Sequence, residues 1–179
     1  MIPIAALGTV AALHGALKER MGEVAAQFWQ LETETSGTAR APKVIDGWLP
    51  PRENTPGEQF PFMLVRPKSG IDTPQSSDEN ATAIFQIIVG TFSDTDDGWL
   101  DLVLVIDAIR DSLGAKPLLN HTAELGAGDV TVRTAFEHVG PLTWEIPDDQ
   151  ARPQWLATIN TVWMLPRPQR QEQDDPNEE

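Results

Sequence analysis

The stretch from Ala81 to Leu113 constrains the fold more than any other part of the sequence. Its first part, Ala81–Phe92, is apolar at both odd and even positions, which is typical of a strand covered on two faces. A polar turn that ends in a glycine follows at Ser93–Gly98. From Trp99 to Leu113, apolar residues recur every three or four positions, which predicts an amphipathic helix. A strand that leads directly into such a helix predicts a layered α+β domain.

The rest of the pattern predicts a central, mostly antiparallel sheet flanked by this helix and by a long N-terminal helix. The N-terminal helix is expected from about Ile4 to Leu31, with a narrow apolar seam that favours packing on the protein's own sheet over packing on a partner. The prolines around Phe60–Pro67 indicate an edge strand or one with limited pairing. Lys43–Leu49 is expected to be a short strand or an extended arm. Further strands are expected at Val130–Val139 and Trp155–Leu165, whereas Leu118–Gly128 has no clear pattern.

The 179 residues are expected to form one domain over 1–166 with long loop or arm insertions at 33–58 and 68–80. Residues 167–179 are polar and acidic, a composition typical of a disordered tail. In the last strand, Trp155 and Trp163 are eight residues apart, so strict alternation places them on the same face.

The charge and the missing cysteines exclude several classes of protein. A net charge of −14 argues against a surface that grips nucleic acid or anionic lipid. Without cysteine there is no disulfide scaffold, thiolate metal site or cysteine nucleophile. No apolar run is long enough to span a membrane, and the N-terminus has no secretory signal, so we expect synthesis in the cytosol.

The turn after the central strand is the best candidate for chemistry. Its carboxylates, together with Asp101, could hold calcium or magnesium. An EF-hand register that starts at Asp94 fails, however, because position six, which needs glycine, falls on Trp99, one residue after Gly98, and position twelve, which needs glutamate, falls on Val105. Negative charge at a helix start favours a capping role instead. Since phosphate loops, nucleophile elbows and metal-binding His–Glu pairs are also missing, the sequence indicates no enzyme, no metal and no cofactor.

The side chains of Trp48 and His14 could each have either a structural or a functional role. Trp48, next to the proline pair Pro50–Pro51, could anchor a partner or could cap the edge of the core, and the sequence does not decide between these. His14 lies in the seam of the first helix, where a hydrogen-bonded, half-buried residue is expected rather than a ligand.

Four blocks of the chain together resemble the tail terminator, or tail completion, proteins of long-tailed bacteriophages. The blocks are Asp46–Pro51, Phe60–Pro67, the strand–turn–helix described above, and Pro141–Pro147 with Trp155 and the final strand. The resemblance covers roughly residues 44–166. The longer segment at 33–43 and the acidic tail depart from it, which leaves open which ends contact tube, connector or sheath.

The resemblance implies a structural protein of the virion with a tail-terminator-like fold, assembled in the host cytoplasm and located at the head-proximal end of the tail. Family members form a ring, usually a homohexamer, that caps the tail tube, stops its growth and offers a surface to head–tail connector or stopper proteins. DNA passes through the lumen without specific binding, and acidic residues of the Asp72–Asn80 loop or the Asp94–Asp97 turn are expected to line it. Candidate interface residues are Trp48, Asp72, Asp78, Glu79, Asp94, Asp96, Asp97 and Trp155.

Two alternatives stay open. The first is another neck component, a connector or stopper, which shares the assembly role but has different partners. The second is a small acidic module that binds a metal through the Asp94–Asp101 cluster.

Overall fold

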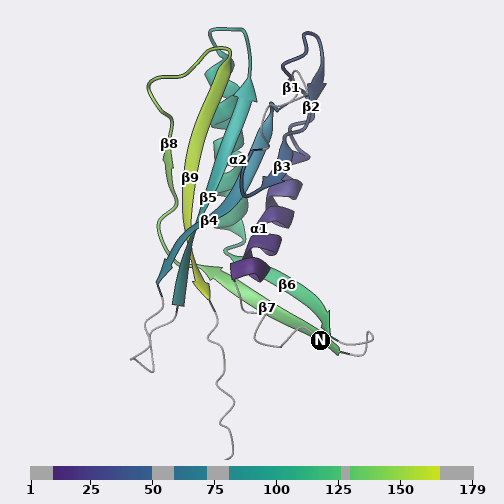
Figure 1. Ribbon diagram of the computed structural model, residues 1–179, viewed down its shortest axis with the longest axis vertical. Coiled ribbons are helices and arrows are strands. Elements are labelled where there is room, and N and C mark those ends of the chain that lie inside the picture. Colours follow the sequence, from purple (N-terminus) through teal and green to yellow (C-terminus); the bar gives the residue numbers. More distant parts are fainter. Residues whose placement is uncertain (1–9, 50–58, 72–80, 126–129, 166–179) are drawn as a thin grey trace, which may run out of the picture.

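The computed structural model of the protein describes residues 10–49, 59–71, 81–125 and 130–165 (Figure 1). The elements of these residues follow one another in this order: α1 Val10–Ala25, β1 Leu31–Glu32, β2 Ala39–Arg40, β3 Lys43–Asp46, β4 Phe62–Ile71, β5 Ala81–Phe92, α2 Gly98–Ala115, β6 Leu118–Leu125, β7 Val130–His138, β8 Thr143–Glu145 and β9 Gln154–Leu165. The predicted central strand and the predicted strands near the C-terminal end lie within about a residue of their expected bounds.

A seven-stranded sheet forms the centre of the protein. Its strands follow the order β3-β4-β5-β9-β7-β6, and β8 also pairs with β9. The β3–β4 pair is parallel, and the other pairs of this sheet are antiparallel. A separate two-stranded ribbon is made by β1 and β2. The expectation of an α+β fold with two helices and a mostly antiparallel sheet is therefore confirmed.

The sheet is built around the pairing of β5 with β9. Their twelve-residue ladder runs without interruption from Ala81 opposite Leu165 to Phe92 opposite Gln154. Alternate residues of both strands face the helices, as the period of two requires. On β9 this places Trp155 and Trp163 on the same buried face, which confirms the expectation from their spacing.

Both helices pack on one face of the sheet and against each other (Figure 1). Helix α1 buries a stripe that includes alanines, which let it approach closely, and helix α2 buries a stripe of larger side chains. These residues share one core with the inner faces of β5 and β9. The largest fully buried side chains include Leu13, Leu17, Met21, Leu102, Ile109, Phe85 and Trp163. His14 is half-buried on α1, and its Nε2 lies 3.0 Å from the carbonyl oxygen of Val65, as its position in the seam predicts.

The sheet curls where β7 and β8 share one edge of β9. Strand β8 pairs with the middle of β9, whereas β7 pairs with it only at Glu137 and His138. Between them Gly140 lies against Val162, so close that a Cβ atom at this position would be 2.7 Å from Val162 Cγ2. Beyond this junction β7 leaves β9 and forms a hairpin with β6 that projects from the lower end of the sheet (Figure 1).

Besides strand β3, which ends at Asp46 and not at Leu49, three expected boundaries differ from the structure. Helix α1 ends at Ala25, because the amides of Gln27 and Phe28 bond to carbonyls only three residues back and the chain then turns into β1; the segment 4–9 lies outside the described residues. The predicted unpatterned segment after α2 is strand β6, which pairs along its whole length with β7.

The expected edge strand is the third difference. Strand β4 continues to Ile71 and lies between β3 and β5, so the interpretations of Phe60–Pro67 as an edge strand and of residues 68–71 as loop are wrong. The alternative for Phe60–Pro67, a strand with limited pairing, agrees with the structure, because β3 pairs only with Phe62–Val65. From Arg66 onward, the outer edge of β4 has no neighbouring strand in the described part of the chain, and Pro67 lies there.

Gly90 of β5 provides a test of packing on the sheet face that is opposite to the helices. A Cβ atom at this position would lie 2.7 Å from Phe62 Cζ and 2.8 Å from Phe60 Cε1, and both rings are buried. Gly90→Ala is therefore expected to lower the free energy of unfolding by about 1–3 kcal/mol, the usual effect of overpacking. In urea unfolding, the matched control Gly114→Ala should instead stabilise by about 0.5 kcal/mol, because it lies in α2 with open space around it. Equal stabilities of Gly90→Ala and the parent protein would contradict this packing.

Candidate interaction surfaces

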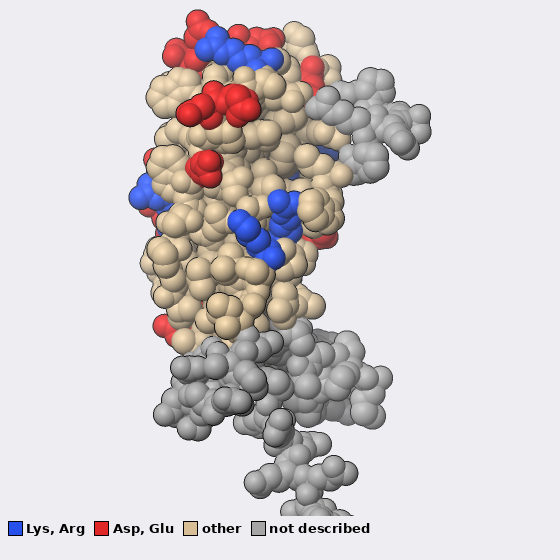
Figure 2. Space-filling view, turned by 60° about the vertical axis from the view of Figure 1, so that its left-hand side comes forward, with Lys and Arg blue, Asp and Glu red and all other residues tan. Residues whose placement is uncertain are grey.

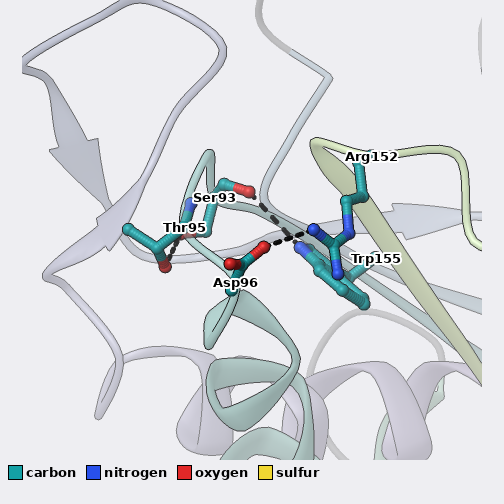
Figure 3. A network of polar contacts seen from close by, with 5 residues as sticks. All are labelled: Ser93, Thr95, Asp96, Arg152 and Trp155. Atoms are coloured by element: carbon teal, nitrogen blue, oxygen red, sulfur yellow. Dashed lines mark hydrogen bonds and ion pairs between the residues drawn. The ribbon is translucent and has the colours of Figure 1, made fainter.

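The turn between β5 and α2 is held by hydrogen bonds to the start of β9. The amide of Ser93 donates to the carbonyl of Pro153 over 3.0 Å, and the indole Nε1–H of Trp155 donates to the carbonyl of Ser93 over 3.3 Å. Within the turn, Ser93 Oγ lies 3.0 Å from Thr95 Oγ1 (Figure 3). Gly98 is required where α2 begins, because a Cβ atom there would be 2.6 Å from Trp155 Nε1. The turn is therefore rigid and has a fixed position on the sheet.

An arginine from the β8–β9 connection holds one carboxylate of this turn. Arg152 forms an ion pair with Asp96, and its guanidinium lies over the ring of Trp155, 5.5 Å from the ring centre (Figure 3). Trp155 itself is buried and belongs to the core. Its side chain is therefore used inside the chain and is no longer a candidate for contact with a partner.

The expected capping of α2 by side chains does not occur. Asp97 is the N-cap residue of the helix, but its side chain makes no capping hydrogen bond. Asp96 is turned toward Arg152, and Asp94 and Asp97 are exposed. Neither Asp94 nor Asp97 forms a hydrogen bond or ion pair through its side chain within the part of the chain that the structure describes. What remains of the capping hypothesis is the favourable charge at the helix start.

Acidic side chains gather at the end of the molecule that carries this turn. Asp148 and Asp149, in the β8–β9 connection, are exposed like the carboxylates of the turn. Figure 2 shows that most of the Asp and Glu side chains on this side of the protein lie at its upper end, whereas Lys and Arg are found both among them and nearer the middle. The protein thus presents an acidic end and a less acidic sheet face.

A cavity of about 390 Å³ lies between the α1–β1 connection and the start of α2. It is lined by the carboxylates of Glu32 and Asp101 and by the apolar Phe28 and Leu104, among others. Burial raises the pKa of Asp101, and the negative charge of Glu32 raises it further. Among the described residues no three His, Asp or Glu side chains are grouped as metal ligands, so this cavity offers a pair of carboxylates only.

Trp48 and Arg66 form a second surface on the sheet face that is opposite to the helices. Trp48 follows β3 and is highly exposed, and the guanidinium of Arg66 stacks on its ring at 4.4 Å from the ring centre. Arg66 Nε donates to Gln86 Oε1 over 2.9 Å, and Gln86 Nε2 donates to Asn160 Oδ1 over 3.3 Å. These hydrogen bonds hold the guanidinium and the indole in one position. We call this surface, made of Trp48 and Arg66, the Trp48–Arg66 platform.

The register of the sheet explains why these polar residues meet. Arg66 is opposite Gln86, Gln86 is opposite Asn160, and Asn160 is opposite Thr143, so one row of polar residues crosses four strands. Gln86 is the single polar residue inside an apolar run of β5, which is a signal that the sequence contains. Which residues face it across the sheet depends on the register, and sequence reasoning therefore missed Arg66, Gln86 and Asn160.

Large apolar side chains are exposed at several separate places. Four of the six tryptophans are exposed, with exposed fractions of 69% for Trp29, 74% for Trp48, 43% for Trp99 and 50% for Trp144. Of the residues predicted to contact partners, Trp48, Asp94, Asp96 and Asp97 lie on the surface, and Asp72, Asp78 and Glu79 lie outside the described residues. No helix in the described ranges is long and apolar enough to cross a membrane.

Comparison with known proteins adds little to these observations. No family model and no curated protein matches the chain. Fifteen chains of solved structures resemble it. One of them has 14% sequence identity and a TM-score of 0.48, and the match covers 89% of this chain and 97% of that one. A TM-score this low does not support any inference about function.

The raised pKa of Asp101 predicts a pH-dependent effect on stability. Because folding raises this pKa above its ordinary value of 3.8, the charged carboxylate is unfavourable in the folded state, and stability is lost as the pH rises through the folded-state pKa. Asp101→Asn is therefore expected to melt at a higher temperature than the parent protein near neutral pH. The difference should shrink as the pH falls and disappear well below pH 3.8, where the carboxyl is protonated in both states.

Thermal unfolding followed by circular dichroism between pH 3 and pH 7.5 would measure this difference. Asp111→Asn, which changes an exposed carboxylate of the same helix, is the matched control. A melting-temperature difference between Asp101→Asn and the parent that does not change with pH would contradict the assignment.

Proposed function

We propose that this chain is a tail terminator of a long-tailed bacteriophage, a structural protein with a tail-terminator-like fold. In this proposal its copies form a ring, in the family a hexamer, that caps the end of the tail tube. The ring stops the growth of the tube and offers a surface to the head–tail connector or stopper protein. The location is the neck of the virion, at the head-proximal end of the tail.

The exposure of tryptophans is the observation that carries this proposal. Each tryptophan side chain has roughly 150–250 Å² of surface to bury, and exposed aromatic residues are enriched where proteins contact one another. Trp29, Trp48, Trp99 and Trp144 come from four separate segments of the chain, so covering all of them takes more than one small contact. A subunit of a ring contacts two neighbouring copies and one partner on each side of the ring, and these contacts together could cover tryptophans on separate segments.

The negative charge of the protein fits a ring through which DNA passes. A net charge of −14 and an acidic end would keep a ring from holding the phosphate backbone as DNA moves through it. Acidic residues of the 72–80 segment or of the Asp94–Asp97 turn are the candidates for the lining of the lumen. This role needs no catalytic residue, metal or cofactor.

Electron microscopy of the purified protein, alone and after mixing with tail tubes of the same phage, tests this function. The expected result is a ring that binds to one end of the tube, together with tubes of uniform length when the protein is present during assembly. Binding to the head connector without binding to tubes would indicate another neck component instead. A monomer that joins neither tubes nor connectors would refute the proposal.

A further inference from the structure

The Trp48–Arg66 platform has the features of a receptor for a carboxylate. Two donors of the Arg66 guanidinium are bound to the uncharged amide of Gln86, and one face of the guanidinium rests on Trp48. No Asp or Glu pairs with Arg66 in the part of the chain that the structure describes. Since the planar guanidinium binds carboxylates through paired donors, Arg66 is fixed in place and lacks the partner that suits it best.

The same chain already shows an arginine on a tryptophan with its carboxylate present. At the acidic end, Arg152 lies over Trp155 and forms an ion pair with Asp96 of the β5–α2 turn. Two features distinguish the Trp48–Arg66 platform from this arrangement. Its tryptophan is exposed rather than buried, and its arginine has no carboxylate partner among the residues that the structure describes.

The carboxylates that match the platform are in the same β5–α2 turn. Asp94 and Asp97 are exposed and have no side-chain partner among the described residues, while the backbone that carries them is fixed by Ser93 and Trp155. They lie at the acidic end of the molecule, and the platform lies on the sheet face that is opposite to the helices. A rigid acidic turn and a rigid cationic platform on different parts of one surface can join neighbouring copies.

We propose that the Trp48–Arg66 platform binds a carboxylate, Asp94 or Asp97, from the β5–α2 turn of a second copy of this chain. The contact joins two different patches, so it is heterologous and leads to a closed ring when its rotation closes. This would be the contact between neighbouring subunits in the proposed tail-terminator ring, so the proposal rests on that proposed function. A carboxylate held by the neighbour's Arg66 does not line the channel, so other acidic residues of the ring would do so.

Exchange of the charges tests this contact on the full-length chain. Arg66→Glu and the double variant Asp94→Lys with Asp97→Lys are each expected to weaken self-association about tenfold or more, measured by sedimentation velocity over a concentration series. An equimolar mixture of the two should associate again, because each variant restores the other's contact and an even-numbered ring can alternate them. Arg110→Glu, which reverses a surface arginine on α2, is the control and should associate like the parent protein.

Three results would overturn the contact. The first is unchanged association of both variants; if the parent protein still caps tubes in the microscope, the proposed function then stands without this contact. The second is weakening by Arg66→Glu alone, since the carboxylate would then come from another part of the neighbouring copy. The third is a mixture that stays dissociated although circular dichroism shows both variants folded.

Cross-linking gives an independent measurement, because the chain has no cysteine. Leu49→Cys places a thiol beside Trp48, and Thr95→Cys places one between Asp94 and Asp96; both positions are exposed. A mixture of the two variants is expected to form a disulfide-linked dimer under mild oxidation, and the chain that carries both cysteines should form a ladder of covalent oligomers. Equal amounts of dimer from each variant by itself would indicate a symmetric contact and overturn the proposal.

Discussion

The continuous pairing of β5 with β9 is the interaction on which the rest of the structure depends. Twelve residues of each strand are in register, and each strand places alternate side chains in the core beneath the helices. A shift of one residue would turn the buried face of β9, including Trp155 and Trp163, toward the other side of the sheet. The same register places Trp155 next to the β5–α2 turn and Asn160 next to Gln86. Both candidate surfaces therefore depend on this ladder, and the Trp48–Arg66 platform depends in addition on the register between β4 and β5.

The parts of the fold that could be predicted from the sequence are those with a strong apolar period. Strand β5, helix α2 and strand β9 have such periods, and their observed bounds are close to the predicted ones. Strand β6 has a weaker pattern, because Leu119 is buried while its neighbour Leu118 is exposed, and its bounds follow from its pairing with β7. The apolar seam of α1 continues beyond Ala25, but the backbone tightens there, and a spacing pattern does not reveal that change.

The candidate surfaces were less predictable than the fold, because they depend on contacts between distant residues. Asp96 was a natural capping residue by its position, yet an arginine 56 residues later in the chain pairs with it. Arg66 meets Gln86 and Asn160 only because three strands align. For Trp48 the sequence left two interpretations open, and the structure shows an exposed ring stacked on Arg66. Sequence spacing provides the periods of single elements, whereas surfaces arise from the register between them.

The outer edge of β4 has a further consequence for the way copies can join. Beyond β3 this edge carries Pro67 and Lys68, and the register with β5 shifts between Pro67 and Ser69. A proline lacks an amide hydrogen, a lysine resists burial, and a bulge bends the strand, so each of these features opposes the addition of a strand from another molecule. Sheets of neighbouring copies would then not merge into a continuous backbone ladder through this edge of β4. Assembly would instead depend on side chains, which allows subunits to collect in solution without fibre formation and to join only in a defined geometry.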